Sequence, residues 1–344
     1  MTSSPILVTG ASGFVALHTI IQSLQQGYKV RATLRNSARE VEVREIVAKY
    51  ADAKDNLEFV LADLMQDSNW DKAMQGCEYV LHVASPFPLF EPKREDELII
   101  PAVQGTQRVL RAAHNANIKR VVIVSSVAAV YSGHNGENRI FDENDWSIVE
   151  NNIGAYAKSK TLAERAAWEF INGADAKRIH KMEMVAINPP LILGPMLDKQ
   201  SHTSAELIRV FMRGEVPGVA RLKMGIVDVR DVASALLLAM KTPEAAGQRF
   251  TCPAATLWYK EIADILRSEY SARGYKKIPR IQFPDFAVRL LALFDKKIAI
   301  VVRDLNWDYD ISNEKAKRVL KWTPRSKEEA ILSMAESLIE LNIL

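Results

Sequence analysis

The sequence predicts an α/β protein built on a doubly wound parallel sheet, with a smaller mixed α/β lobe toward the C-terminal side. Three observations lead to this prediction. Short β-branched runs alternate with helical patterns up to residue 190, as expected for strands joined by right-handed crossovers. A glycine turn separates the first apolar run from the first helical pattern. Beyond Asn188 the alternation stops at a series of prolines and glycines, which indicates a second unit.

The first strand–turn–helix unit carries the clearest motif. The apolar run 6–8 is followed by Thr9-Gly10-Ala11-Ser12-Gly13-Phe14-Val15-Ala16, and a helical pattern continues to Leu24. Gly10 permits a tight turn, Gly13 leaves room for phosphates, and Ala16 is small enough for close helix–strand packing. A helix N-terminus at this point would hold a pyrophosphate. The motif therefore indicates a Rossmann-type dinucleotide site.

The remaining elements follow in order. Further strands are expected at 29–35, 57–63, 79–84, 120–125 and 182–188, with helices between them such as 103–115 and 156–171. Residues 225–229 have the pattern of a strand that returns to the sheet edge, followed by a helix through Met240. A last helix is expected over 326–339.

These elements predict two units. Residues 1–190, with 225–241 returning to them, form a dinucleotide-binding domain, and residues 191–224 and 242–344 form a substrate-binding lobe. Ligands of open α/β sheets bind beyond the carboxyl ends of the strands, so we expect the substrate cleft between lobe and sheet.

Composition excludes several classes of protein. The 344 residues include 45 Lys+Arg and 42 Asp+Glu, and the basic residues are dispersed, so we expect no nucleic-acid partner. Two cysteines, Cys77 and Cys252, form neither a disulfide framework nor a zinc motif, and we expect buried thiols and no metal. With no signal peptide and no membrane-spanning run, a cytoplasmic protein is expected.

A tyrosine and a lysine four residues apart suggest chemistry. Tyr156 and Lys160 share one face of an expected helix. A cation near a phenol lowers its pKa, and such a tyrosine can act as a general acid or base. Ser125-Ser126 ends the strand 120–125, where a hydroxyl would face the cleft and could donate to a developing alkoxide.

With these motifs together, the chain resembles an extended short-chain dehydrogenase/reductase, and within that group the dihydroflavonol-4-reductase-like aldehyde and ketone reductases. The resemblance covers essentially the whole length. The matching pieces are 9–16, 30–35, Asp63-Leu64, 82–87, 101–106, Ser125-Ser126, 156–160, 188–195 and 228–233.

The resemblance implies a role for each catalytic residue. Tyr156 would protonate the carbonyl oxygen as hydride arrives. Lys160 would lower the pKa of Tyr156 and bind the nicotinamide ribose. Ser126 would hold the substrate oxygen, and we prefer it to Ser125 because it is nearer the following loop. The implied cofactor-binding residues are Thr9, Gly10, Ser12, Gly13, Phe14, Val15, Arg35, Asp63, Leu64, Val83, Ala84, Ser85, Thr106, Val124, Ser125, Tyr156, Lys160, Pro189, Leu191 and Ile192.

The residue that ends the second strand indicates which cofactor binds. An acidic residue there would accept from the ribose 2′-OH of NAD, but this strand ends in Arg35, followed by Asn36 and Ser37. A guanidinium suits a 2′-phosphate. We therefore predict NADP(H).

The function expected is NADPH-dependent reduction of an aldehyde or ketone to an alcohol. Ser126 is followed by Val127-Ala128-Ala129 rather than by carboxylates, which argues against a sugar-nucleotide dehydratase. The run Asn152-Ile153-Gly154-Ala155 differs from the Asn-Trp-Tyr-Cys-type run of cinnamoyl-CoA reductases. An oxidative hydroxysteroid-type dehydrogenase and a non-catalytic dinucleotide-binding regulatory protein remain as alternatives.

The substrate pocket is expected to be apolar. Pro86, Phe87, Val127 and Pro190 are the candidate lining residues. We expect a small-molecule carbonyl substrate, no membrane partner, and a monomer or homodimer.

Overall fold

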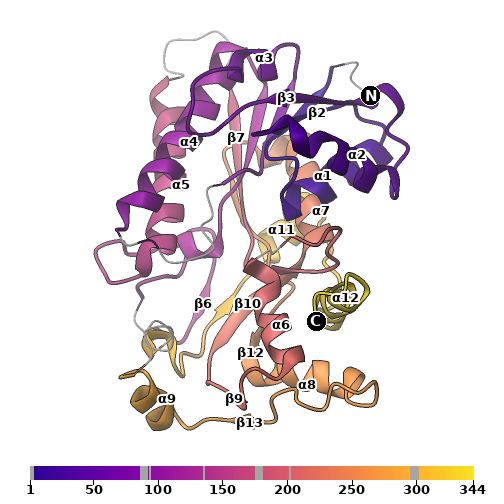
Figure 1. Cartoon of the computed structure of the whole chain (residues 1–344). Coiled ribbons are helices and arrows are strands. Elements are labelled where there is room, and N and C mark those ends of the chain that lie inside the picture. Colours follow the sequence, from indigo (N-terminus) through magenta and orange to yellow (C-terminus); the bar gives the residue numbers. More distant parts are fainter. Residues whose placement is uncertain are drawn as a thin grey trace.

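The computed structural model describes residues 4–85, 92, 94–134, 136–174, 181–200, 203–294 and 302–344. Within these ranges the largest sheet has seven strands in the order β11-β7-β5-β4-β1-β2-β3, and neighbouring strands are parallel (Figure 1). Its strands are β1 (Ile6–Val8), β2 (Val30–Leu34), β3 (Leu57–Leu61), β4 (Tyr79–His82), β5 (Arg120–Val124), β7 (Glu183–Asn188) and β11 (Arg249–Thr251).

The strand order creates a crevice at one edge of the sheet. From β1 the chain moves outward to β2 and β3, and then returns to place β4 on the other side of β1. The connections after β1 and β4 therefore leave in opposite directions, and ligands of such sheets bind where this happens. The predicted Rossmann-type doubly wound fold is confirmed.

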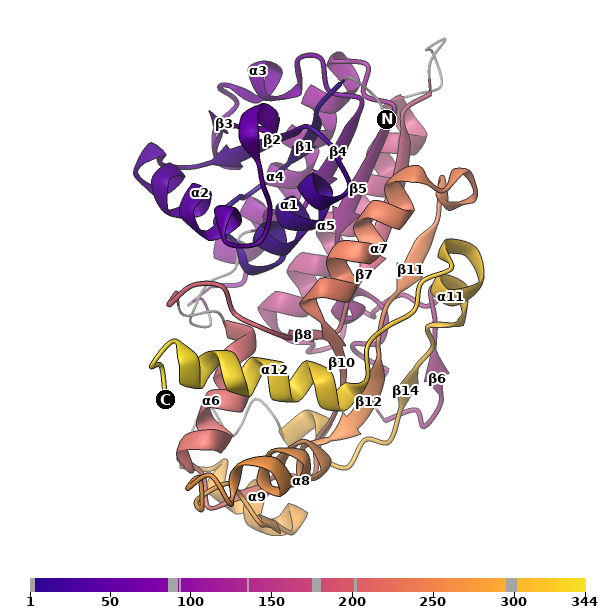
Figure 2. The same cartoon turned by 90° about the vertical axis from the view of Figure 1, so that its right-hand side faces the viewer.

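Helices cover both faces of the sheet. On one face lie α3 (Trp70–Met74), α4 (Asp96–Asn115) and α5 (Gly154–Ala174); on the other lie α1 (Phe14–Gln25), α2 (Glu40–Ala48), α7 (Val229–Lys241) and α11 (Glu314–Leu320) (Figures 1 and 2).

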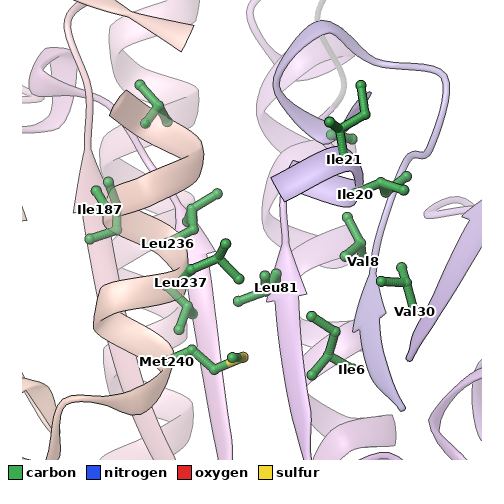
Figure 3. Packing of buried hydrophobic residues seen from close by; sticks show 14 of the residues in the cluster. Ile6, Val8, Ile20, Ile21, Val30, Leu81, Ile187, Leu236, Leu237 and Met240 are labelled. Atoms are coloured by element: carbon green, nitrogen blue, oxygen red, sulfur yellow. The ribbon is translucent and has the colours of Figure 1, made fainter. Parts of the chain in front are cut away.

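Side chains of the strands alternate between these two layers. Ile6 and Val8 pack with α1 and α7, as do Leu81 and Ile187 (Figure 3). Leu7, between Ile6 and Val8, packs with the α3–α4–α5 layer instead. Because both faces are buried, the strands are apolar at nearly every position, which is why short continuous apolar runs predicted them. Each buried aliphatic side chain contributes roughly 1.5–3 kcal/mol to folding.

A second unit lies below the carboxyl edge of the sheet (Figure 1). Its three-stranded sheet has the order β12-β10-β8, and α12 lies across it (Figure 2). Its elements are β8 (Leu191–Leu193), α6 (Glu206–Arg213), β9 (Gly218–Val219), β10 (Lys223–Asp228), β12 (Ala255–Trp258), α8 (Tyr259–Tyr270), β13 (Ile281–Gln282), α9 (Asp285–Leu291) and α12 (Lys327–Glu340). The pair β6 (Ile140–Phe141) and β14 (Asp310–Ile311) lies beside it.

Short 3₁₀ helices complete the chain. They are η1 (Ser37–Arg39), η2 (Lys54–Asn56), η3 (Val127–Ala129), η5 (Thr203–Ala205), η6 (Pro243–Ala245) and η7 (Val302–Asp304).

One expected strand pairs elsewhere. Residues 225–229 were expected at the edge of the main sheet, but β10 pairs with β8 and β12, and the edge strand is β11 at Arg249–Thr251. The run Pro189-Pro190 turns the chain away from the main sheet, so the next strands form their own. The helix α7 does return to the main sheet. The domain boundaries themselves stay a prediction.

Two further expectations concern the described residues alone. Cys77 and Cys252 are free and buried, as predicted. In the part of the chain that the structure describes, no helix could cross a membrane, and no three His, Cys, Asp or Glu side chains gather to hold a metal ion.

Candidate active site

The predicted site residues come from the carboxyl ends of neighbouring strands. Thr9–Gly13 follows β1, Arg35 follows β2, and Asp63-Leu64 follows β3. Val83–Ser85 follows β4, Ser125-Ser126 follows β5, and Pro189 follows β7. Parallel strands put all these segments at one edge of the sheet, beside the crevice between β1 and β4.

The glycine turn is tight and held by its neighbours. Gly10 has φ +76°, and a Cβ built on it would lie 3.0 Å from the Cβ of Ala84. The amide of Gly10 donates to Thr33 Oγ1 (3.0 Å), and that of Ala84 donates to Thr9 Oγ1 (2.9 Å). Gly13 is the N-cap of α1, and no side chain caps this helix. The backbone amides in the first turn of α1 are therefore available to bind an anion in the crevice.

Two arginines stand at the end of β2. Arg35 is exposed and immediately follows the strand. Arg39 ends η1, and its guanidinium lies 2.7 Å from a Glu42 carboxylate oxygen and 3.9 Å from Asp198 Oδ2. Even so, Nε and one terminal nitrogen of Arg39 are buried and make no hydrogen bond of good geometry. Arg39 was missed from the sequence, although its spacing of four residues from Arg35 across a short turn is a signal.

The two serines after β5 have different partners. Ser125 Oγ donates to Glu164 Oε2 at 2.5 Å. Ser126 is the N-cap of η3, where its Oγ accepts from the Ala128 amide at 3.1 Å. The Ser126 hydroxyl also hydrogen-bonds the Tyr156 side chain. Ser126 is thus the serine next to the tyrosine.

Tyr156 lies near the start of α5 and is 37% exposed. Removal of water by the surrounding protein raises the pKa of its phenol, and the hydrogen bond from Ser126 opposes this. The expected lowering of this pKa by Lys160 is not what the structure shows, because the Lys160 ammonium is directed elsewhere. A phenol with a raised pKa is fully protonated at neutral pH, which suits a proton donor.

Lys160 is buried one turn after Tyr156. Its Nζ donates to Ser85 Oγ (3.2 Å) and to the Val124 carbonyl oxygen (3.5 Å). Burial lowers the pKa of the ammonium to about 8, and the charge of Glu164 acts in the opposite direction. The contacts place it beneath the ends of β4 and β5.

The other predicted site residues differ in how well their positions fit the proposed roles. Leu64 packs against Gly105, the neighbour of Thr106 on α4, so these two segments do meet. Val127 is only 5% exposed and belongs to an apolar cluster with Phe141, Trp307 and Tyr309, which leaves it little surface for a substrate. Pro190 contacts Gly225 on β10. Pro86 and Phe87 lie outside the described residues.

Three polar residues beneath the serines were missed. Glu164, Asn188 and Arg249 are all buried, and they form one hydrogen-bonded group with Ser125. Glu164 carries a local signal, since it follows Lys160 by one helical turn on the same face. Arg249 carries none, because its partner is 85 residues away in sequence.

A model described as the NAD dependent epimerase/dehydratase family matches residues 6–252. The chain belongs to this family. Its members are extended short-chain dehydrogenase/reductases, so the resemblance seen in the motifs is confirmed.

Relatives by sequence include plant reductases. The chain is 34% identical to cinnamoyl-CoA reductase CAD2 of Medicago truncatula, with 97% of this chain and 95% of the relative covered. It is 32% identical to a putative anthocyanidin reductase of Ginkgo biloba, over 78% of this chain and 81% of the relative.

Relatives by structure include yeast enzymes. The chain superposes on yeast methylglyoxal/isovaleraldehyde reductase Gre2 complexed with NADPH with a TM-score of 0.82 and 27% identity, covering 98% of this chain and 99% of the other. Gre2 of Candida albicans in complex with NADPH gives 0.81 and 27%, with the same coverage. The family membership and these neighbours make the chain a member of a group of oxidoreductases.

Proposed function

We propose that this protein is an NADPH-dependent carbonyl reductase that converts an aldehyde or ketone to an alcohol, with Tyr156 as the proton donor. The observation that carries the proposal is the hydrogen bond between Ser126 and Tyr156, with Lys160 one helical turn later in contact with the ends of β4 and β5. The crevice beside the glycine turn lies at the same edge of the sheet.

The residues at this edge fit NADPH. The first turn of α1, which no side chain caps, and the tight glycine turn before it suit a pyrophosphate. Arg35 and Arg39 supply positive charge after the end of β2, where an arginine would donate charge-assisted hydrogen bonds to a 2′-phosphate. Two Gre2 structures on which the chain superposes hold NADPH, and the predicted cofactor, NADP(H), is confirmed.

NADPH, when bound, supplies the hydride that reaches the carbonyl carbon. Ser126 Oγ donates a hydrogen bond to the carbonyl oxygen, where negative charge develops. Tyr156 then transfers its phenolic proton to that oxygen, and the alcohol forms. Lys160 contacts the ends of β4 and β5, where its ammonium would bind the nicotinamide ribose, and solvent then restores the proton of Tyr156.

Substrate choice is the point at which the relatives differ. The yeast Gre2 structure is named for methylglyoxal and isovaleraldehyde reduction, whereas CAD2 of Medicago truncatula is named for cinnamoyl-CoA reduction. Reduction of a CoA thioester is therefore a second candidate, which the identity to CAD2 over 97% of the chain favours. The run Asn152–Ala155, at the start of α5, argues for the free carbonyl.

One experiment separates these candidates. NADPH oxidation is followed with an aliphatic aldehyde, an aromatic aldehyde, a 1,2-dicarbonyl, a flavonoid ketone and a cinnamoyl thioester of CoA. Turnover of a free carbonyl supports the proposal, and turnover of the thioester alone replaces it with the second candidate.

A variant tests the proton donor. Tyr156→Phe keeps the ring and removes the proton, so kcat should fall by about 10²-fold or more while NADPH binding, measured by fluorescence, persists. Tyr270→Phe is the matched control: its hydroxyl donates to the Leu332 carbonyl in the second unit, so its loss should affect stability and leave kcat unchanged. Near-normal turnover by Tyr156→Phe would contradict the assignment.

A further inference from the structure

A buried carboxylate behind the proposed site has all of its acceptor positions facing donors. Glu164 is 1% exposed and lies on α5, one helical turn after Lys160. Its Oε2 accepts from Ser125 Oγ (2.5 Å) and Asn188 Nδ2 (2.7 Å). Its Oε1 accepts from Arg249 Nε (2.6 Å) and Trp168 Nε1 (3.2 Å). Only an ionised carboxylate accepts at both oxygens from four donors.

Three of the four donors come from three adjacent strands of the sheet: Ser125 directly follows β5, Asn188 ends β7, and Arg249 begins β11. The fourth donor, Trp168, lies on α5 with Glu164. Asn188 Nδ2 also donates to the Ser126 carbonyl oxygen at 3.1 Å. Through this amide, Glu164 is connected to the backbone of the serine that faces Tyr156.

Arg249 compensates the buried negative charge of Glu164 with its own positive charge. Its guanidinium lies over the Trp146 ring at 3.7 Å and donates to the carbonyl oxygens of Glu143 (2.9 Å) and Asp145 (2.8 Å). One terminal nitrogen of Arg249 is therefore held by the backbone, while its Nε is held by Glu164. A buried ion pair adds little net stability compared with apolar residues of the same volume. The role of the Glu164–Arg249 pair is therefore better explained by the residues that it positions.

We infer that Glu164 is a positioning residue: its carboxylate holds the ends of β5 and β7 so that Ser126 faces Tyr156, and its charge supports the ammonium of Lys160. The inference rests on the proposed function for its effect on turnover. Glu164 touches none of the reacting atoms and acts through Ser125, Asn188 and Lys160.

The titratable groups around Lys160 allow the effect of the Glu164 charge on the Lys160 pKa to be tested. His82 on β4 also faces Lys160, but burial lowers the pKa of His82 to about 3, so it is neutral at working pH. Tyr156 on the same helix has a raised pKa and is neutral too. Glu164 is left as the negative charge that raises the pKa of Lys160.

The sheet offers a matched control at its opposite edge. Arg120 and Glu183 pair at the amino ends of β5 and β7, with 2.7 Å between Arg120 Nε and Glu183 Oε2. Glu183→Gln likewise removes a carboxylate that pairs with an arginine, but at the amino ends of β5 and β7. A merely structural effect of breaking an Arg–Glu pair would appear in both variants.

The experiment compares Glu164→Gln with Glu183→Gln. We expect kcat of Glu164→Gln to fall about ten- to a hundredfold with the Kd for NADPH little changed, because misplacement of Ser126 affects the reacting geometry. Glu183→Gln should keep the wild-type kcat. Competitive acetylation of Lys160 across pH, measured by mass spectrometry, should give a lower lysine pKa in Glu164→Gln alone. Wild-type kcat and an unchanged Lys160 pKa in a folded Glu164→Gln would overturn the inference.

Two further measurements test the inference if the first comparison fails. If Glu164→Gln does not fold, Ser125→Ala removes one contact to the strand end and leaves the Arg249 pair; a several-fold lower kcat supports the inference and an unchanged kcat overturns it. If the wild type reduces no carbonyl, the proposed function fails, and the acetylation profile of Lys160 alone decides whether Glu164 supports that lysine.

Discussion

The adjacent residues Ser125 and Ser126 show how neighbours in sequence acquire different chemistry. Extended backbone turns their side chains to opposite sides, so Ser125 reaches Glu164 and Ser126 reaches Tyr156. The sequence predicted a hydroxyl at this strand end, and it favoured Ser126 only by its nearness to the next loop. What separates them physically is a carboxylate 39 residues further along the chain, which no local pattern reveals.

The first prediction compares these serines. Ser126→Ala should cost about 2–4 kcal/mol of transition-state stabilisation, because it removes a donor to the developing oxyanion. Ser125→Ala should cost less, since its hydroxyl acts only through Glu164. The measurement is kcat/KM for the best carbonyl substrate. The reverse order would move the oxyanion role to Ser125.

A second residue-scale prediction concerns the arginines after β2. A charge-assisted contact of Arg35 with a 2′-phosphate contributes about 1–3 kcal/mol, so NADPH should be preferred to NADH about ten- to hundredfold in kcat/KM. The preference should weaken with added salt, because Arg35 is exposed. Arg35→Asp should reverse it, and Arg39→Ala should reduce it.

Arg318→Asp on α11 is the matched control, since this arginine is also exposed and lies away from β2. It makes the same change of charge and should leave the preference intact. Equal use of NADH and NADPH by the wild type would show that Arg35 does not select the cofactor.

At the scale of elements, most strands that the sequence predicted are buried on both faces, and β3 at the sheet edge is partly exposed. Their β-branched runs are typical of parallel strands covered by helices. β11 was missed because it is three residues long and begins with Arg249, which is charged yet buried against Glu164. β10 was placed in the wrong sheet because an apolar run predicts a strand and does not say which strand it pairs with.

The turn after β1 gives an element-scale prediction. Gly10→Ala must place a Cβ at positive φ and 3.0 Å from Ala84 Cβ, so both strain and a close contact oppose it. Gly76→Ala is a control with φ +74° and no atom within 4 Å of the new Cβ. Strain alone should cost about 1 kcal/mol at Gly76. Gly10→Ala should cost more and weaken NADPH binding as well.

Urea unfolding and NADPH titration measure the two effects. Equal destabilisation by the two variants, with equal NADPH affinity, would contradict a role for close packing of Gly10 on Ala84.

At the scale of the whole molecule, the two units are joined by polar contacts from distant segments. His18 on α1 hydrogen-bonds the Pro195 carbonyl at 2.9 Å, across 177 residues of sequence. The Trp322 indole donates to the Asp231 carbonyl at 2.9 Å, and Arg325 pairs with the Asp231 carboxylate. These hydrogen bonds and this ion pair join residues that are distant in sequence. Sequence patterns therefore predicted a second unit but not the contacts that hold it to the first.

Two buried histidines make stability depend on pH. Burial lowers the pKa of His18 to about 4 and that of His82 to about 3, from an ordinary value of 6.5. The unfolded chain binds a proton at each histidine below about pH 6.5, whereas the native chain does not until the lower pKa is reached. Their contribution is therefore complete above about pH 6.5 and is lost as the pH falls toward these lower values.

The last prediction follows from that sign. Between about pH 6 and 4.5, each histidine should reduce the free energy of unfolding by about 1.4 kcal/mol per pH unit of acidification. Urea midpoints measured across this range should fall steeply for the wild type. His18→Gln and His82→Gln should each have a shallower dependence, because each removes one proton from the difference between the native and unfolded states, whereas acidic residues affect all three proteins alike. A dependence as steep in both variants as in the wild type would show that carboxylates, and not these histidines, govern the loss of stability in acid.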